Sequence, residues 1–289
     1  MYQLDGISYI ITHTDHTGRQ TLRRVFGNAV SDPDWCAHLT NASKSVEVSD
    51  ASSSLPGAPG GIIGDRYESF QSLVFDLVVW TDDQEERAEQ LELISDLMVG
   101  LKSDLTLEWI DALGTPKTIN GLRLSSAIEP QNVPGEGHKT VQLAMTAPDP
   151  RTYSQLIHTT QIDGADVTVN PTATVIGYSA GNAPSWPVFY LHGPLTSATI
   201  EGESGVLQIN VPPDRAVVAG DHIRIDTNPV SRSVLLNSLG NIRGWVDIDV
   251  VSWFTIDPRE TSNDVAITFE GSGVTSAVEM RWRSAWWVS

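Results

Sequence analysis

The chain has 289 residues, of which 40% are hydrophobic and 19% are charged, and its formal net charge at pH 7 is −18. This length fits one large or two ordinary domains, and the composition is typical of a globular protein with buried cores. The negative charge repels phosphate backbones, which argues against groove binding and nucleic-acid chemistry. The single cysteine, Cys36, excludes an internal disulfide and a multi-cysteine zinc site. No apolar run approaches the roughly 18 residues that span a bilayer, and no signal sequence is recognisable at the N-terminus, so neither membrane insertion nor export by such a signal is expected.

Two β-rich runs open the chain, residues 2–12 and 20–30, and Asp15 lies in the turn between them. This turn suits a hairpin, so the two runs are predicted to begin a sheet. The turn's His13, Asp15 and His16 could also be interpreted as metal ligands. On a strand, however, positions 13 and 16 point to opposite faces and no second ligand cluster follows, which favours a solvated turn.

Residues 52–64 are rich in Ser, Pro and Gly and have the most flexible composition in the chain. They are predicted to form a long functional loop or an arm between two strand-like segments. Their glycine spacing matches neither the dinucleotide fingerprint nor the nucleotide-binding P-loop. Residues 135–140 fail the P-loop pattern as well, because His138 stands where the motif needs a glycine directly before the lysine. Turns are therefore expected in both segments, and no cofactor is expected.

Residues 67–80 alternate between two kinds of side chain, which predicts a long strand. After them the period changes, and one amphipathic helix is predicted over about residues 83–101, with Asp82 as its cap. The acidic residues of its first turn could be imagined as catalytic carboxylates, yet such acids are typical of a solvated helix start. With further strands expected at 104–111, 117–128 and 139–146, the first half is predicted to be α+β. The predicted buried face of the long strand is Leu73, Phe75, Leu77 and Val79, and the apolar positions of the helix are Ala88, Leu91, Ile94, Met98 and Leu101.

Residues 147–155 mark a joint just past the middle of the chain. Pro148 and Pro150 cannot donate to a sheet ladder, and each pushes the residue before it towards an extended conformation. Together they are expected to end the preceding strand and to separate two domains.

After this joint the sequence shows strands and turns without a helical period. Many short strands at this spacing indicate an all-β sandwich or barrel. In the last strand, Val278, Met280 and Trp282 alternate with charged residues, so one face is predicted to be core and the other wet. The predicted strands cover residues 155–158, 166–169, 172–176, 186–192, 198–201, 206–210, 222–226, 233–236, 265–269 and 276–287.

Five of the six tryptophans of this second half are clustered towards its end: Trp245, Trp253, Trp282, Trp286 and Trp287. They could form a platform that stacks on sugar rings, but in a sandwich a packed aromatic core is the favoured interpretation. Because the last two are adjacent, one of them must face outward or into another subunit. Residues 202–205 lack the second spaced glycine of a hydrolase nucleophile elbow, and no catalytic constellation is recognised.

The second half resembles the C-terminal domain of siphophage distal tail proteins, the Dit family of the phage tail tip. The resemblance is carried by Gly181-Asn182-Ala183-Pro184-Ser185-Trp186-Pro187-Val188, by His192-Gly193-Pro194, by the segment from Ala219 to Thr227 and by Trp282-Arg283. In the first half the order of features agrees: a Pro-Gly-rich loop, a long strand led by Arg66-Tyr67, one helix and the Asp-Pro-Arg-Thr-Tyr-Ser joint. One departure is the segment 253–258, which affects only a loop.

The resemblance implies a mainly β protein with two domains. Residues 1–150 would form a split-barrel belt domain that assembles into a hexameric ring, and residues 151–289 would form a galectin-like β-sandwich. The implied role is that of a structural virion protein at the distal end of the tail, assembled in the host cytoplasm and without enzymatic activity. Implied partners are other copies of the chain, the tail tube protein, a tail-tip hub protein, the tape measure protein and a receptor-binding protein.

Two sets of residues are expected to make contacts with partners. The tip of the arm would take part in the ring interface, and exposed tryptophans would serve an alternative function, carbohydrate binding at the host surface. No catalytic, cofactor-binding or metal-ligating residue is predicted. The interface residues are Pro56, Gly57, Pro59, Gly60, Gly61, Ile62 and Ile63, and the glycan-stacking residues are Trp286 and Trp287.

Overall fold

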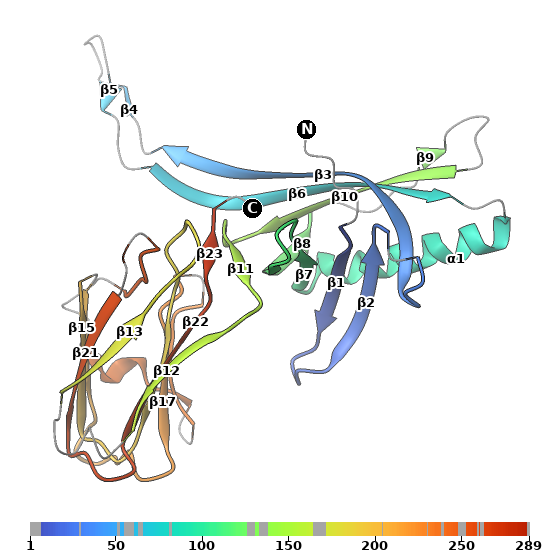
Figure 1. Ribbon diagram of the computed structural model, residues 1–289. Helices are drawn as coiled ribbons and strands as arrows, with labels where there is room; N and C mark the ends of the chain where they lie inside the picture. The colour runs from blue at the N-terminus through green and yellow to red at the C-terminus, as the bar shows by residue number, and fades with distance from the viewer. Residues whose placement is uncertain are drawn as a thin grey trace. The chain divides into compact units, whose positions relative to one another are not determined.

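The computed structural model shows a mainly β chain that divides into two compact units, residues 1–153 with 287–289 and residues 154–286. The prediction of a mainly β fold with one α-helix is confirmed for the described part of the chain (Figure 1). The division between the units falls inside the predicted joint. The structure describes residues 7–28, 30–50, 53–54, 61–62, 66–80, 83–125, 131–132, 138–163, 172–203, 205–229, 231–237, 240–247, 253–258, 260 and 263–287.

Seven strands of the first unit close into a barrel. Their order around it is β8-β7-β1-β2-β3-β6-β10, and a short pairing of β10 with β8 completes the circle. All neighbours are antiparallel except β2 and β3. Closure leaves no edge where the ladder is complete, which stabilises a small sheet in water. The barrel strands are β1 (Tyr9–Thr14), β2 (Gln20–Phe26), β3 (Trp35–Asp50), β6 (Arg66–Trp80), β7 (Leu105–Ile110), β8 (Pro116–Leu124) and β10 (His138–Ala147).

The first hairpin forms because Asp15 organises the turn between β1 and β2. Its carboxylate accepts hydrogen bonds from the backbone amides of Thr17 and Arg19. This confirms the predicted hairpin. The nearby His13 donates or accepts a hydrogen bond with Thr21 Oγ1 at 2.6 Å, while His16 is exposed.

Alternation along β6 fills the barrel, as the sequence predicts. The inward side chains Leu73, Phe75, Leu77 and Val79 are all buried. Core residues of the facing strands, such as Ile11 and Leu107, lie in the same cluster. The described residues therefore fill the barrel interior with packed apolar side chains.

The helix is shorter than predicted and buries a different face. α1 spans Gln84–Ser95 and is followed by a 3₁₀ turn, η1 (Asp96–Leu101). Its N-cap is Asp83, whose carboxylate accepts from the amide of Glu85, so the prediction of Asp82 as the cap was wrong. Leu101 is exposed, because the tighter turn changes the direction of the last side chains, and Ala88 within α1 is exposed as well. The buried positions of the helix and the 3₁₀ turn are Gln90, Ile94, Leu97 and Gly100.

The second unit is a sandwich of two antiparallel sheets. Their orders are β12-β22-β14-β17-β18-β19 and β13-β21-β15-β16-β20, and one hydrophobic cluster contains residues of both. Trp282 lies in this cluster, and Trp245 and Trp253 pack against it, which fits a packed aromatic core. The strands are β12 (His158–Ile162), β13 (Thr172–Gly177), β14 (Val188–His192), β15 (Ser197–Gly202), β16 (Gly205–Asn210), β17 (His222–Asp226), β18 (Ser233–Leu236), β19 (Gly240–Asn241), β20 (Val246–Asp247), β21 (Asn263–Glu270) and β22 (Ala277–Trp282).

Two strand predictions in the second half need correction. The run 155–158 is mostly a turn, because Ser154 Oγ accepts the amide of Leu156 and the strand begins only at His158. The run 276–287 is broken into β22 and a short β23 (Ala285–Trp286). Ser284 lies at the break, where its hydroxyl accepts the amide of Ala180. The strand predicted at 166–169 lies outside the described residues.

Gly181 offers a direct test of the sandwich. A Cβ at this position would lie 1.7 Å from the carbonyl oxygen of Ala285, the same oxygen that accepts the amides of Asn182 and Ala183. Gly181→Ala should therefore lower the free energy of unfolding of this unit by about 3 kcal/mol, the upper range of overpacking. Urea titration followed by tryptophan fluorescence measures the change.

Gly244→Ala is the matched control. Nothing lies within 4 Å of a Cβ at Gly244, so the expected change is within about 0.5 kcal/mol. Equal stability of the two variants would contradict the close approach at Gly181.

Candidate assembly surface

Two long strands lead to the predicted arm at residues 52–64, and the name arm is used from here on for these paired strands together with the segment between them. β3 pairs with β6 along its length, with Asp50 opposite Arg66 at the far end. After this end of the ladder, β4 (Ser53–Ser54) pairs with β5 (Gly61–Ile62). Both strands are labelled at the upper left of Figure 1. The described part of the predicted arm is thus a short antiparallel pair that follows the end of the β3–β6 ladder along the chain.

One edge of this arm has no strand beside it in the described chain. β2 contacts β3 only through Val25 with Trp35 and Phe26 with Ala37. From His38 to Asp50, β3 has β6 as its sole strand partner among the described residues. At about 3.3 Å per residue, this open edge is roughly 40 Å long. An edge of this kind presents backbone N–H and C=O groups that can pair with another chain.

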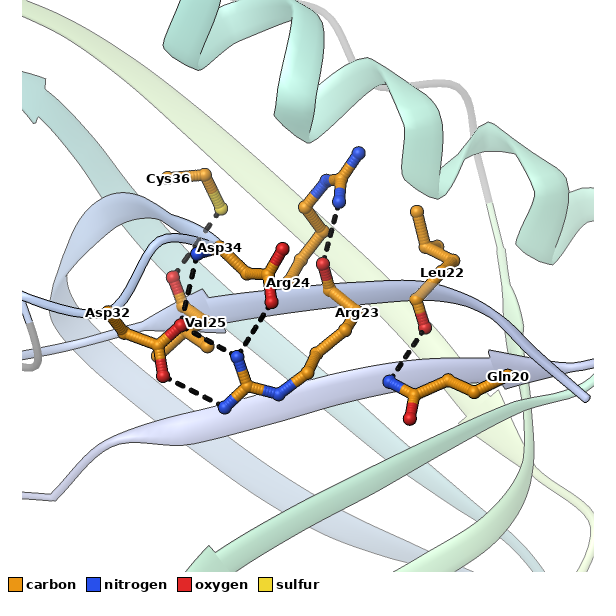
Figure 2. Close-up of polar contacts among 8 residues, drawn as sticks. All are labelled: Gln20, Leu22, Arg23, Arg24, Val25, Asp32, Asp34 and Cys36. Atoms are coloured by element: carbon orange, nitrogen blue, oxygen red, sulfur yellow. Dashed lines mark hydrogen bonds and ion pairs between the residues drawn. The ribbon is translucent and has the colours of Figure 1, made fainter.

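A polar cluster at the start of β3 fixes where the arm begins (Figure 2). Arg23 Nη1 donates to Asp32 Oδ1 at 2.6 Å and to Asp34 Oδ2 at 2.8 Å, while its Nη2 donates to Asp32 Oδ2 at 2.9 Å. The loop is held further by the Val25 amide, which donates to the Asp34 carbonyl, and by the Trp35 amide, which donates to the Asp32 carbonyl. Parallel neighbours normally need a long crossover, so this short one depends on the clamp.

The next residue of β2 ties the same region to the helix. Arg24 Nε donates to the carbonyl of Leu93 at 2.8 Å, and its Nη2 forms an ion pair with Asp96. On the inner side, the thiol of Cys36 is buried and donates to the carbonyl of Val25 (Figure 2). Burial raises the pKa of this thiol to about 12, so Cys36 is a small core residue and not a reactive thiolate.

The joint between the units carries a second charged cluster, which lies within the first unit. The guanidinium of Arg151 pairs with the Asp149 carboxylate through bonds of 2.8 and 3.0 Å, and Tyr153 Oη donates to Asp149 Oδ2 at 2.6 Å. Both charged residues are buried. Arg151 also lies 5.9 Å from the ring centre of Trp287, so the C-terminal segment packs against the joint. Loss of either partner would leave an uncompensated buried charge, so the two residues stabilise the joint only together.

The predicted contact residues are only partly described. Gly61 and Ile62 form β5, while Pro56, Gly57, Pro59, Gly60 and Ile63 lie outside the described residues. Trp286 belongs to β23 and is half-buried, and Trp287 packs against Arg151. The ring-interface and glycan-stacking roles of these residues stay predictions. The open edge of β3 was not singled out from the sequence.

Chemistry-bearing clusters are scarce in the described part of the chain. Within it, no group of three or more His, Cys, Asp or Glu is arranged to hold a metal. None of the described helices is long and apolar enough to cross a membrane. One hollow of about 340 Å³ opens in the second unit, over the buried ring of Phe254. Its lining includes the carboxylates of Glu203, Asp257, Glu260 and Asp264.

The Arg23 clamp gives a prediction about acid stability. Hydrogen bonds from Arg23 hold the pKa of Asp32 below its ordinary value. The clamp therefore stabilises the fold fully above a pH of about 3.9, the pKa of an Asp side chain in the unfolded chain. This stabilisation is lost as the pH falls through the lower pKa that Asp32 has in the folded protein. Asp32→Asn should cost about 1 kcal/mol at pH 7, allowing for partial solvent screening. The difference between variant and parent should shrink at acid pH, as measured by urea unfolding across the pH range.

The matched control is Asp104→Asn. Asp104 pairs with Arg123, but both side chains are more than half exposed, so no measurable change is expected. If Asp32→Asn behaves like Asp104→Asn, the clamp does not hold the loop.

Comparison with known proteins adds information at the level of the fold. No protein-family model and no curated protein matches the sequence. Among solved structures, this chain is similar to the Dit protein of phage SPP1, which is described as a paradigm of the hub adsorption apparatus in phages that infect Gram-positive bacteria. The match covers 96% of this chain and 98% of the SPP1 protein, with 12% sequence identity and a TM-score of 0.61. Two structures of the activated phage p2 baseplate match as well. The one with Ca covers 96% of this chain and 98% of its own at 11% identity, with a TM-score of 0.49. The one with Sr covers 95% of this chain and 97% of its own at 12% identity, with a TM-score of 0.48. The chain therefore has the fold of the SPP1 Dit protein along nearly its whole length.

Proposed function

We propose that the protein is a structural component of a phage tail tip, in which copies of the chain form a ring that acts as a hub. The observation that carries this proposal is the full-length likeness to the SPP1 hub protein, which extends over both units. The barrel and its long arm provide a physical means of assembly. A hexamer is the ring that the sequence resemblance implies.

Ring closure would use the open edge of β3. A head-to-tail contact between copies closes into a ring when the rotation between neighbours is suitable. Each backbone hydrogen bond formed along the edge contributes a net of roughly 0.5–1.5 kcal/mol, so several in a row stabilise a contact without many side-chain contacts. Burying this edge would also remove a hazard of aggregation, because a long unpaired strand attracts other chains.

The arm tip at residues 53–62 would extend this contact to the neighbouring copy. Its described strands β4 and β5 follow the Asp50–Arg66 end of the β3–β6 ladder along the chain, where another subunit could pair with them. We infer that Gly61 and Ile62, with Pro56, Gly57, Pro59, Gly60 and Ile63, contribute to the interface.

The ring would join the tail tube protein to a tail-tip hub protein, with the tape measure protein and a receptor-binding protein as further partners. Its place would be the distal end of the tail in the virion, after assembly in the host cytoplasm. The net charge of −18 suits a ring around a DNA channel, because like charges discourage DNA from sticking to the wall. A strongly positive lumen would contradict this part of the proposal. The protein would act by assembly alone, without catalysis.

Deleting the arm tip tests the proposal. A variant in which residues 53–62 are replaced by a short turn should assemble into rings less readily, because the most distant contact is lost. Light scattering and negative-stain imaging over a range of concentrations measure the assembly, and circular dichroism checks that both units remain folded.

A second variant keeps the length of this segment but replaces it by Gly and Ser, which separates the contribution of the side chains from that of the reach. Unchanged assembly of the deletion variant would refute the role of the arm. A parent protein that stays strictly monomeric at every concentration would count against the ring itself.

A further inference from the structure

Two histidines face each other on the outer surface of the six-stranded sheet. His192 ends β14 and His222 begins β17, and the register places them directly opposite each other. Their neighbours along the strands, Leu191 and Ile223, are fully buried in the sandwich core. Because side chains alternate along a strand, both imidazoles point away from the core. Their ring centres lie 5.9 Å apart.

The charged groups around this pair are already engaged with one another. On β22, both oxygens of Glu279 accept hydrogen bonds from Arg281, at 2.6 and 3.0 Å. The guanidinium of Arg281 lies 4.6 Å from the ring centre of Tyr190. On β17, Arg224 donates to Asp226 at 2.9 Å. The carboxylates of Glu279 and Asp226 are thus each matched by an arginine, whereas Asp221, beside His222, accepts the backbone amide of Val218.

No ring nitrogen of His192 or His222 hydrogen-bonds to another group of the described chain. The contacts of the two rings are with each other and, for His222, with Tyr190 at 5.8 Å. Burial, and then the positive charge that His222 can carry, lowers the pKa of His192 below its ordinary value of 6.5. The neutral imidazole, which a lowered pKa favours, is the form that binds metals.

We propose that His192 and His222 together bind one divalent transition-metal ion, with water completing its coordination. Metal–nitrogen bonds of about 2.0–2.1 Å to a shared ion hold two imidazole centres roughly 5 Å apart. The observed 5.9 Å is close to this separation, and rotation about the side-chain χ angles can change it while the strands stay paired. Water-filled positions on such an ion remain free for a carboxylate or imidazole of another protein.

The donor set fixes which ions fit. Imidazole suits Cu²⁺, Ni²⁺ and Zn²⁺, whereas Mg²⁺ and Ca²⁺ require oxygen ligands. Affinity should follow the order Cu²⁺ above Ni²⁺ and Zn²⁺, and Mg²⁺ and Ca²⁺ should show no binding at this site. Binding should weaken as the pH falls below about 6.5, because protons compete for the same nitrogens.

Isothermal titration of the full chain with NiCl₂, ZnCl₂ or CuCl₂ tests the proposal. The parent should bind one ion per chain at this site. Because both ligands are needed, His192→Asn, His222→Asn and the double variant should each bind one ion fewer than the parent. The Cu²⁺ complex, observed by electron paramagnetic resonance, should carry nitrogen couplings from two imidazoles. Circular dichroism confirms that the variants are folded.

His16→Asn is the matched control, since His16 is exposed in the β1–β2 turn and should leave the titration unchanged. Binding that survives in the double variant, or that disappears in His16→Asn, would place the metal elsewhere. Absence of any Ni²⁺, Zn²⁺ or Cu²⁺ binding by the folded parent at pH 7.5 would also overturn the proposal. These outcomes do not depend on ring formation.

Discussion

The clamp of Arg23 on Asp32 and Asp34 is the interaction on which the first unit depends. It holds the loop that turns the chain from the end of β2 back to the start of β3. Because the loop is short, β3 runs beside β2 for only two residue pairs before it leaves. The barrel is therefore closed at one end of β3, while the rest of the strand has an open edge. One constrained crossover thus separates the packed core from the surface available for assembly.

The barrel and the arm are stabilised by different interactions. Inside the barrel, alternating apolar residues of β6 and β10 bury their side chains, and this burial provides most of the stability. Along the arm, stability comes mainly from the backbone ladder between β3 and β6. A ladder with a free edge is more easily exchanged and extended than a closed one. The chain thus combines a rigid body with an element suited to pairing with another copy.

The joint was predicted from Pro148 and Pro150, and the structure adds the buried pair of Asp149 and Arg151 between and beside them. Prolines restrict the backbone, whereas the ion pair and Trp287 hold it in one arrangement within the first unit. No spacing rule predicts that Arg151 and Trp287 meet, because this contact joins distant parts of the chain. The joint is therefore a defined element and not a simple linker.

Other parts of the fold show what local patterns can and cannot predict. The strand β6 and the strands of the sandwich follow from clear alternation of apolar residues. β3 does not, because residues 40–45 are mostly polar in sequence and the length of the strand is set by pairing with β6. The helix was placed well, but its buried face was shifted, because the change to a 3₁₀ turn after Ser95 alters the period. The pairing of His192 with His222 could not be predicted, because it depends on the register between β14 and β17 and residues 193–221 lie between the two histidines.

The central claim is that the open edge of β3 is where copies of the chain join. Amide hydrogen exchange along residues 38–50, compared between monomeric and assembled protein, tests it most directly. In an antiparallel pair every second amide faces β6, so the alternate amides should exchange rapidly in the monomer. The account predicts that these outward amides become protected on assembly. Rings in which they still exchange as fast as in the monomer would contradict it.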